Sequence, residues 1–285
     1  MSILKYASRP VFTLAPENSI DRAIGLMEEY RFRHLPVVAS DEIVGIVSDR
    51  DILLSSGWES TDERRSSDNP GQLAGPQRVE QIMSRPVVTI DASATPSRAA
   101  ALMLEKRIGA LPVLEHGRLA GIIAEGDLLR YAQRTQSPTD QPVHAVMRDH
   151  VVRVRPDAPV EEMVDRLRDH HIRHLIIADG DRLVGIASDR DVRRALGRAL
   201  VEDEKAENAG TLYLDRITAA DVMSPVVAMI GPDASLAEAA NRMVEHHIHS
   251  LPVIDEKPAL VGILTSSDIL ATLTDRRAKA AKKRR

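Results

Sequence analysis

The chain has no cysteine among its 285 residues, which excludes disulfide bonds, thiolate metal sites and a cysteine nucleophile. Aromatic residues make up only 2% of the sequence, so a core must be built from aliphatic side chains. No stretch approaches the roughly 18 uninterrupted apolar residues of a membrane span, and the N-terminus lacks the apolar run of a secretion signal. A formal net charge of -4 gives no general attraction to nucleic acid. We therefore expect a cytoplasmic protein.

The sequence does contain repetition, which often decides the whole fold. A shift of 76 residues brings ASRPVFTL (7–14) onto MSRPVVTI (83–90), and a shift of 140 brings GIVSDRD (45–51) onto GIASDRD (185–191). A fourth copy runs from DVMSPVVAMI to GILTSSDIL (221–270) with small insertions. Asp51, Asp127, Asp191 and Asp268 hold equivalent positions in these copies. The chain is therefore four copies of one unit.

The first copy indicates how each unit folds. Ser19 followed by apolar residues at helical spacing predicts a helix over about 19–30. HLPVVA (34–39) and IVGIVS (43–48) are two strand-like runs joined by a polar turn, which predicts a hairpin, and a second helix should start at Ser48. The predicted fold class is α/β (α+β), with four β-α-β-β-α units. Because one such unit buries little surface alone, we expect neighbouring copies to pack sheet against helix in a shared core.

The connections between copies predict how the copies pair. Long polar segments follow Asp51 and Asp191, whereas the link after Asp127 is shorter. We expect one module over residues 1–135, with units at about 5–55 and 79–133, and a second over 143–275, with units at about 143–197 and 217–274. Residues 276–285 form a tail with seven basic residues, which we expect to be disordered.

In combination, the M-S start, the L-P-V strand and the G-I-x-S-x-x-D ending of these copies resemble those of CBS domains, named for cystathionine β-synthase, which pair into Bateman modules. The resemblance covers about four fifths of the chain. It implies a regulatory protein that binds an adenosine-containing nucleotide between paired units, with the motif aspartate accepting hydrogen bonds from both ribose hydroxyls. It implies AMP, ADP or ATP as the ligand, ahead of NAD or S-adenosylmethionine, and no required cofactor.

Carried over residue by residue, the resemblance ranks the four copies. Copies 1 and 3 have the full set of hydroxyl, carboxylate and basic groups: Ser48, Arg50, Asp51, Arg33 and His34 in one, and Ser188, Arg190, Asp191, Arg173 and His174 in the other. Copy 4 keeps Thr265 and Asp268 and offers His249, but Ser267 replaces the arginine. Copy 2 keeps Asp127 but lacks the hydroxyl and the basic groups and adds Glu125, so its hold on a phosphate should be weak.

A plainer interpretation of the same residues stays open. A serine followed three residues later by a carboxylate is a capping box, which begins a helix without any ligand. The functional interpretation places a phosphate at that helix N-terminus, where Ser48 would donate its hydroxyl to it. The repeated glycines are equally open, because a missing Cβ admits either a ligand or close packing; they are Gly45, Gly121, Gly185 and Gly262.

The remaining features separate the classes of function. His170, His171 and His174 cluster, as do His246, His247 and His249, but each cluster spans a helix end and a strand start, so we expect no metal site. The histidines at the helix ends would offset the negative end of the helix dipole. No nucleophile–base pair, P-loop or dinucleotide fingerprint is present, so we do not expect an enzyme.

The predicted function is therefore that of a nucleotide sensor that signals by changed assembly, as a homodimer or through an unidentified effector protein, without membrane contact. The alternative is a structural or nucleic-acid-associated scaffold with degenerate pockets, which would use the basic tail. The sequence assigns no role to the connector over residues 55–78.

Overall fold

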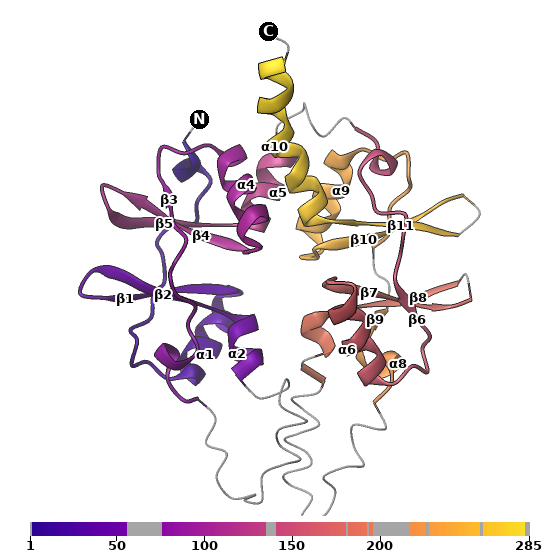
Figure 1. Cartoon of the computed structure of the whole chain (residues 1–285), viewed down its shortest axis with the longest axis horizontal. Coiled ribbons are helices and arrows are strands. Elements are labelled where there is room, and N and C mark those ends of the chain that lie inside the picture. The colour runs from indigo at the N-terminus through magenta and orange to yellow at the C-terminus, as the bar shows by residue number, and fades with distance from the viewer. Residues whose placement is uncertain are drawn as a thin grey trace, which may run out of the picture.

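The computed structural model of the chain describes residues 2–55, 76–134, 141–180, 182–192, 194–195, 217–225, 228–256 and 259–282. The four copies lie around a common centre, with copies 1 and 2 on one side and copies 3 and 4 on the other (Figure 1). Copy 1 lies beside copy 3, and copy 2 lies beside copy 4. The predicted α/β class with four repeated units is confirmed.

Copy 1 folds as its sequence pattern predicts. Helix α1 (Ile20–Tyr30) begins after Ser19, whose side chain accepts a hydrogen bond from the Arg22 N–H at 3.2 Å. The hairpin consists of β1 (His34–Ala39) and β2 (Glu42–Ser48), and α2 (Asp49–Ser55) follows at once. The first strand of the unit is reduced to a single bridge, in which Leu14 pairs in parallel with Val37.

The other copies repeat this order of elements. Copy 2 contains β3 (Ile90–Asp91), α4 (Pro96–Lys106), β4 (Ala110–Glu115), β5 (Arg118–Ala124) and α5 (Glu125–Arg134). Copy 3 contains β6 (Arg153–Val154), α6 (Val160–Asp169), β7 (His174–Asp179) and β8 (Arg182–Ser188), and residues 189–192 and 194–195 are helical. In copy 4 the first strand is again a single bridge, in which Ile230 pairs in parallel with Val253, and α9 (Leu236–Glu245), β10 (Ser250–Ile254), β11 (Leu260–Thr265) and α10 (Ser266–Lys282) follow. The preceding β9 (Ser224–Pro225) pairs antiparallel with β8 of copy 3.

A short helical turn opens each copy and packs on the core of the other copy in its module. These turns are η1 (Ile3–Lys5), η3 (Val79–Gln81), η4 (Val143–Ala145) and α8 (Ala219–Val222). Ile3 of copy 1 lies in the core of copy 2, and Val79 of copy 2 lies in the core of copy 1. Val143 and Ala219 make the same exchange between copies 4 and 3. The shared core that we expected from sheet-on-helix packing is therefore made differently, by exchanged starting segments.

In each copy, a side chain of that exchanged segment packs against the repeated glycine. A Cβ on Gly262 would lie 2.7 Å from Met147 Sδ and 2.8 Å from the Arg148 carbonyl oxygen, closer than real Cβ atoms approach. Met83 lies against Gly45 and Met223 against Gly185 in the same way, and in copy 2 Ala7 takes the place of the methionine against Gly121, 2.9 Å from a Cβ there. Close packing between copies thus explains these glycines, and a ligand is not needed to explain them.

We expect Gly262→Ala to lower the free energy of unfolding by about 1–3 kcal/mol, because the new methyl group meets backbone as well as a buried side chain. Urea denaturation of the two proteins measures the change. Gly25→Ala is the matched control, since nothing lies within 4 Å of a Cβ at this exposed helical position. There the same substitution should stabilise the chain by about 0.5–1 kcal/mol. Equal effects at the two positions would contradict this packing account.

The two modules are joined by helices at one end and by polar contacts at the other. Helices α4 and α5 of copy 2 pack against α9 and α10 of copy 4, and the buried cluster there includes Leu128, Leu270 and Leu273. Copies 3 and 4 meet through their sheets, where Ile176, Ala178 and Ile263 are buried. Residues 276–282 of the C-terminal tail differ from our expectation of disorder, because α10 continues to Lys282, and residues 283–285 lie outside the described ranges. Within the described ranges, no helix is long and apolar enough to cross a membrane.

Candidate functional site

A cavity of about 660 Å³ lies at the centre, and all four copies line it. It brings together most of the residues that the sequence ranked as site residues: Arg33, His34, Ser48, Arg50, Asp51, Arg173, His174, Ser188, Arg190, Asp191 and His249. Thr265, Asp268 and Asp127 are not among its lining residues. The candidate sites of copies 1 and 3 therefore open into one shared space.

The motif aspartates of copies 1 and 3 cap helices and also face the cavity. Asp51 Oδ2 accepts hydrogen bonds from the Ser48 N–H at 2.7 Å and from the Ser48 hydroxyl at 2.6 Å. Asp191 and Ser188 repeat this geometry at 2.8 and 2.6 Å. The capping interpretation is thus confirmed for both. The Ser48 hydroxyl, which we expected to donate to a phosphate, donates to Asp51 in this structure.

The cap uses only one oxygen of each of these two carboxylates, and the second oxygen remains for other contacts. Among the residues that the structure describes, Asp51 Oδ1 accepts only a long hydrogen bond, from the Ser84 hydroxyl at 3.3 Å. Asp191 Oδ1 accepts no hydrogen bond from the residues that the structure describes. Since a carboxylate oxygen can accept two hydrogen bonds, each aspartate keeps accepting capacity on the cavity side.

In copies 2 and 4, an arginine donates a hydrogen bond to that second oxygen. Asp127 caps α5 by accepting the Ala124 N–H at 2.8 Å, and its Oδ1 accepts from the Arg130 guanidinium at 2.5 Å. Asp268 caps α10 through Thr265, and its Oδ1 accepts from Arg148 Nε at 3.2 Å. In both carboxylates, each oxygen therefore already accepts a hydrogen bond. The sequence analysis missed Arg148, although the repeat alignment places it where Ser84 and Ser224 stand in other copies.

The basic groups of the cavity come mainly from arginine, because three histidines of its lining, His34, His174 and His249, are uncharged at neutral pH. Burial, together with the charge of neighbouring arginines, lowers the pKa of His34 to about 3, that of His174 to about 4 and that of His249 to about 3. Burial also lowers the pKa of Arg33, while the charge of Glu125 opposes that shift. Among the described residues, the buried His249 Nδ1 is a polar atom with no hydrogen-bond partner.

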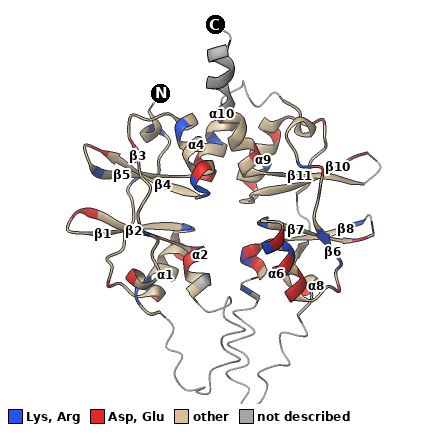
Figure 2. Cartoon of the chain, in the orientation of Figure 1, with Lys and Arg blue, Asp and Glu red and all other residues tan. Residues whose placement is uncertain are grey.

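Carboxylates balance the arginines around the cavity. The lining includes five arginines: Arg33, Arg50, Arg107, Arg173 and Arg190. It also includes five carboxylates: Asp49, Asp51, Glu125, Asp189 and Asp191. Acidic and basic residues are likewise interspersed over all four copies (Figure 2). Arg190 of copy 3 forms an ion pair with Asp49 of copy 1, so some of this balance joins the modules.

The two histidine clusters lie as the sequence predicted, at helix ends. His170 is the C-cap of α6 and His246 is the C-cap of α9. His171 and His247 follow with positive φ angles of 51° and 54°. Within the described part of the chain, no group of three histidine, aspartate or glutamate residues is placed to hold a metal ion.

Together, the fold and the cavity define a protein of four tandem α/β units around a shared polar centre. The family model for the CBS domain matches residues 3–56, 79–134, 143–198 and 219–275, and the chain therefore belongs to the CBS domain family. It consists of four tandem CBS domains in two Bateman modules. The resemblance stated from the motifs is confirmed.

Several known proteins resemble the whole chain. MJ1225, an uncharacterized protein of Methanocaldococcus jannaschii, is 25% identical over 274 residues, which are 94% of this chain and 97% of MJ1225. Its crystal structure matches 95% of this chain and 99% of that chain with a TM-score of 0.77. An uncharacterized conserved protein of Pyrococcus horikoshii matches 96% of this chain and 100% of that chain at 21% identity, with a TM-score of 0.65. These likenesses show the fold.

A shorter solved chain is CBSX2 in complex with AMP, which matches 46% of this chain and 95% of that chain at 26% identity. The TM-score of this partial match is 0.37.

Proposed function

We propose that the chain is a regulatory protein that binds an adenosine-containing nucleotide in the central cavity, at Asp51 in one module and at Asp191 in the other. The observation that carries the proposal is that these two carboxylates line the cavity and have a second oxygen without an arginine partner among the described residues, whereas the second oxygens of Asp127 and Asp268 each pair with an arginine outside the cavity lining. A carboxylate with a free oxygen suits a vicinal diol, because it accepts both hydroxyl donors.

Each module offers the rest of a nucleoside site beside its carboxylate. The wall for the base is apolar and comes from Ile46, Val88 and Ile108 in one module and from Ile186, Ala228 and Ile248 in the other. The arginines that line the cavity supply the positive charge for phosphate. The cavity volume of about 660 Å³ falls in the range of roughly 300–1,000 Å³ typical of small-molecule sites.

The output of such a sensor must be a change in contacts between its parts or with another protein. The cavity is lined by both modules, and Arg190 and Asp49 link copies 3 and 1 across it. A ligand whose phosphate competes for Arg190 binds the linked and unlinked arrangements with different affinity, which is the requirement for a switch. Transmission through a homodimer or an effector protein remains part of the proposal, as does a cytoplasmic location.

Calorimetric titration with AMP, ADP, ATP, NAD and S-adenosylmethionine tests the proposal. We expect at least one of the three adenine nucleotides to bind, with two sites per chain, and NAD and S-adenosylmethionine to bind more weakly. Silence with all five compounds would contradict the proposal and favour the scaffold alternative, which the basic tail would then serve.

A further inference from the structure

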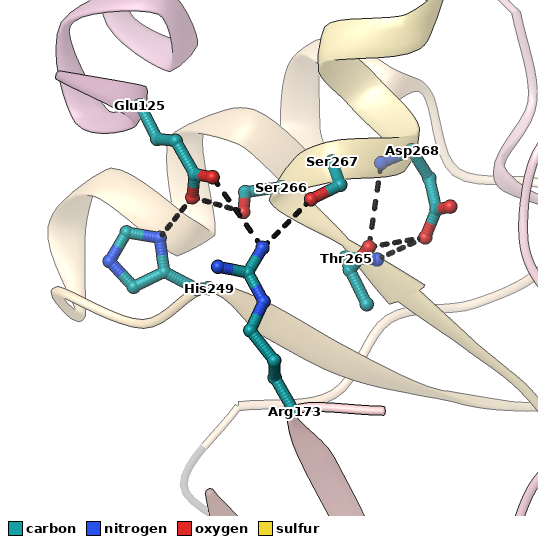
Figure 3. Close-up of polar contacts among 7 residues, drawn as sticks. All are labelled: Glu125, Arg173, His249, Thr265, Ser266, Ser267 and Asp268. Carbon is teal, nitrogen blue, oxygen red and sulfur yellow. Dashed lines mark hydrogen bonds and ion pairs between the residues drawn. The ribbon is translucent and has the colours of Figure 1, made fainter. Parts of the chain in front are cut away.

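Glu125 of copy 2 is a buried carboxylate in contact with the two copies of the opposite module. It begins α5, and its side chain is only 11% exposed. Its Oε2 accepts a hydrogen bond from the Ser266 hydroxyl of copy 4 at 3.1 Å, and its Oε1 lies 3.5 Å from the Arg173 guanidinium of copy 3 (Figure 3). Arg173 in turn donates to the Ser267 hydroxyl at 3.0 Å.

The same carboxylate acts on a second arginine of the cavity. The charge of Glu125 supports the protonated form of Arg33 in copy 1, whereas Arg173 and burial oppose it. Glu125 therefore serves as the internal counter-ion for Arg33 and Arg173, the equivalent arginines of copies 1 and 3. Asp49, which is equivalent to Glu125 in the repeat, does the same for Arg190.

Internal counter-ions change the ligand that such a cavity accepts. Each phosphate group added to a nucleotide brings negative charge toward arginines that are already partly neutralised, and toward Glu125 itself. Repulsion from a fixed unit charge grows in proportion to the charge of the ligand. A monophosphate loses little from it, and a triphosphate loses more.

We propose that Glu125 is a specificity-determining residue that limits the phosphate charge that the cavity accepts, and so removes the advantage in affinity that an adenosine triphosphate would otherwise have over a monophosphate. This inference rests on the proposed function for its ligand class. Copy 2, whose own motif lacks the hydroxyl and the basic groups, thus supplies through Glu125 the counter-ion for the sites of copies 1 and 3.

The wild-type chain provides the first test. At low salt, AMP and ATP should bind with affinities within about threefold of each other, despite the greater charge of ATP. If ATP bound more than about tenfold tighter than AMP, the arginines would not be neutralised and the inference would be overturned.

The second test is Glu125→Gln, which keeps the shape of the side chain and its acceptor for Ser266. We expect binding to tighten about tenfold for ATP and about threefold for AMP, and to stay unchanged for adenosine, because the gain scales with ligand charge. The control is Glu105→Gln, which makes the same change in net charge at a 57% exposed carboxylate of α4 that does not line the cavity. It should leave all three affinities unchanged.

Inorganic tripolyphosphate separates this inference from the proposed function. If neither protein binds a nucleotide but Glu125→Gln binds tripolyphosphate about tenfold tighter than wild type, the proposed function falls, while the role of Glu125 in limiting phosphate charge stands. If nucleotides bind both proteins equally, the inference falls and the proposed function stands. If neither protein binds nucleotide or tripolyphosphate, both fall.

Discussion

Replacing Asp51 and Asp191 together with alanine should abolish detectable nucleotide binding, and either single change should weaken its own site by roughly ten- to several-hundred-fold. The reason is that each carboxylate would accept charge-assisted hydrogen bonds from the ribose, worth about 1.5–3 kcal/mol each. Calorimetric titration of the two single variants and the double variant measures the loss, and the single variants should each keep one intact site.

Asp268→Ala is the matched control for these variants. Asp268 makes the same cap on its helix, through Thr265, but lies outside the cavity lining. Its partner Arg148 has a 54% exposed side chain and can return to solvent. Asp268→Ala should therefore lower the free energy of unfolding by about 1 kcal/mol, as Asp51→Ala and Asp191→Ala should, and leave nucleotide affinity unchanged. An equal loss of binding in Asp268→Ala would show that capping, and not ribose contact, explains the result.

The second large effect concerns stability, and we expect Leu273→Ala to lower the free energy of unfolding by about 2–5 kcal/mol. Leu273 is 3% exposed and lies in the buried cluster that joins copies 2 and 4. Its carbonyl oxygen also accepts the Ser97 hydroxyl of α4 at 2.8 Å, which fixes the two helices together. Urea denaturation measures the change in unfolding free energy.

Ala271→Ser, at an exposed position of the same helix, is the control and should change stability by less than about 0.5 kcal/mol. Because all four copies line the cavity, Leu273→Ala should also weaken nucleotide binding without altering a cavity residue. A Leu273→Ala protein as stable as the control would contradict the account of how the modules are joined.

The sequence predicted what depends on local pattern and on repetition. Helix α1 with its Ser19 cap and the hairpin of β1 and β2 follow from spacing and turn residues. The ranking of the copies followed from side-chain chemistry at equivalent positions, and the cavity brings together the candidate residues of copies 1 and 3.

The contacts between copies could not be predicted, because no local pattern states which copy faces which. Met147 against Gly262 requires the exchange of starting segments within a module, and a glycine alone does not name its neighbour. Arg148 with Asp268 and Glu125 with Arg173 join residues 120 and 48 positions apart in the chain. The sequence analysis counted Glu125 only as an unfavourable charge in copy 2, whereas it lies among groups of the other three copies.

The most direct test is a crystal structure of the chain with bound AMP. The account predicts the ribose hydroxyls within about 3 Å of Asp51 Oδ1 and Asp191 Oδ1, the base against the apolar walls and the phosphate among the central arginines. AMP bound at Asp127 or Asp268, with Asp51 and Asp191 engaged only by Ser48 and Ser188, would contradict it.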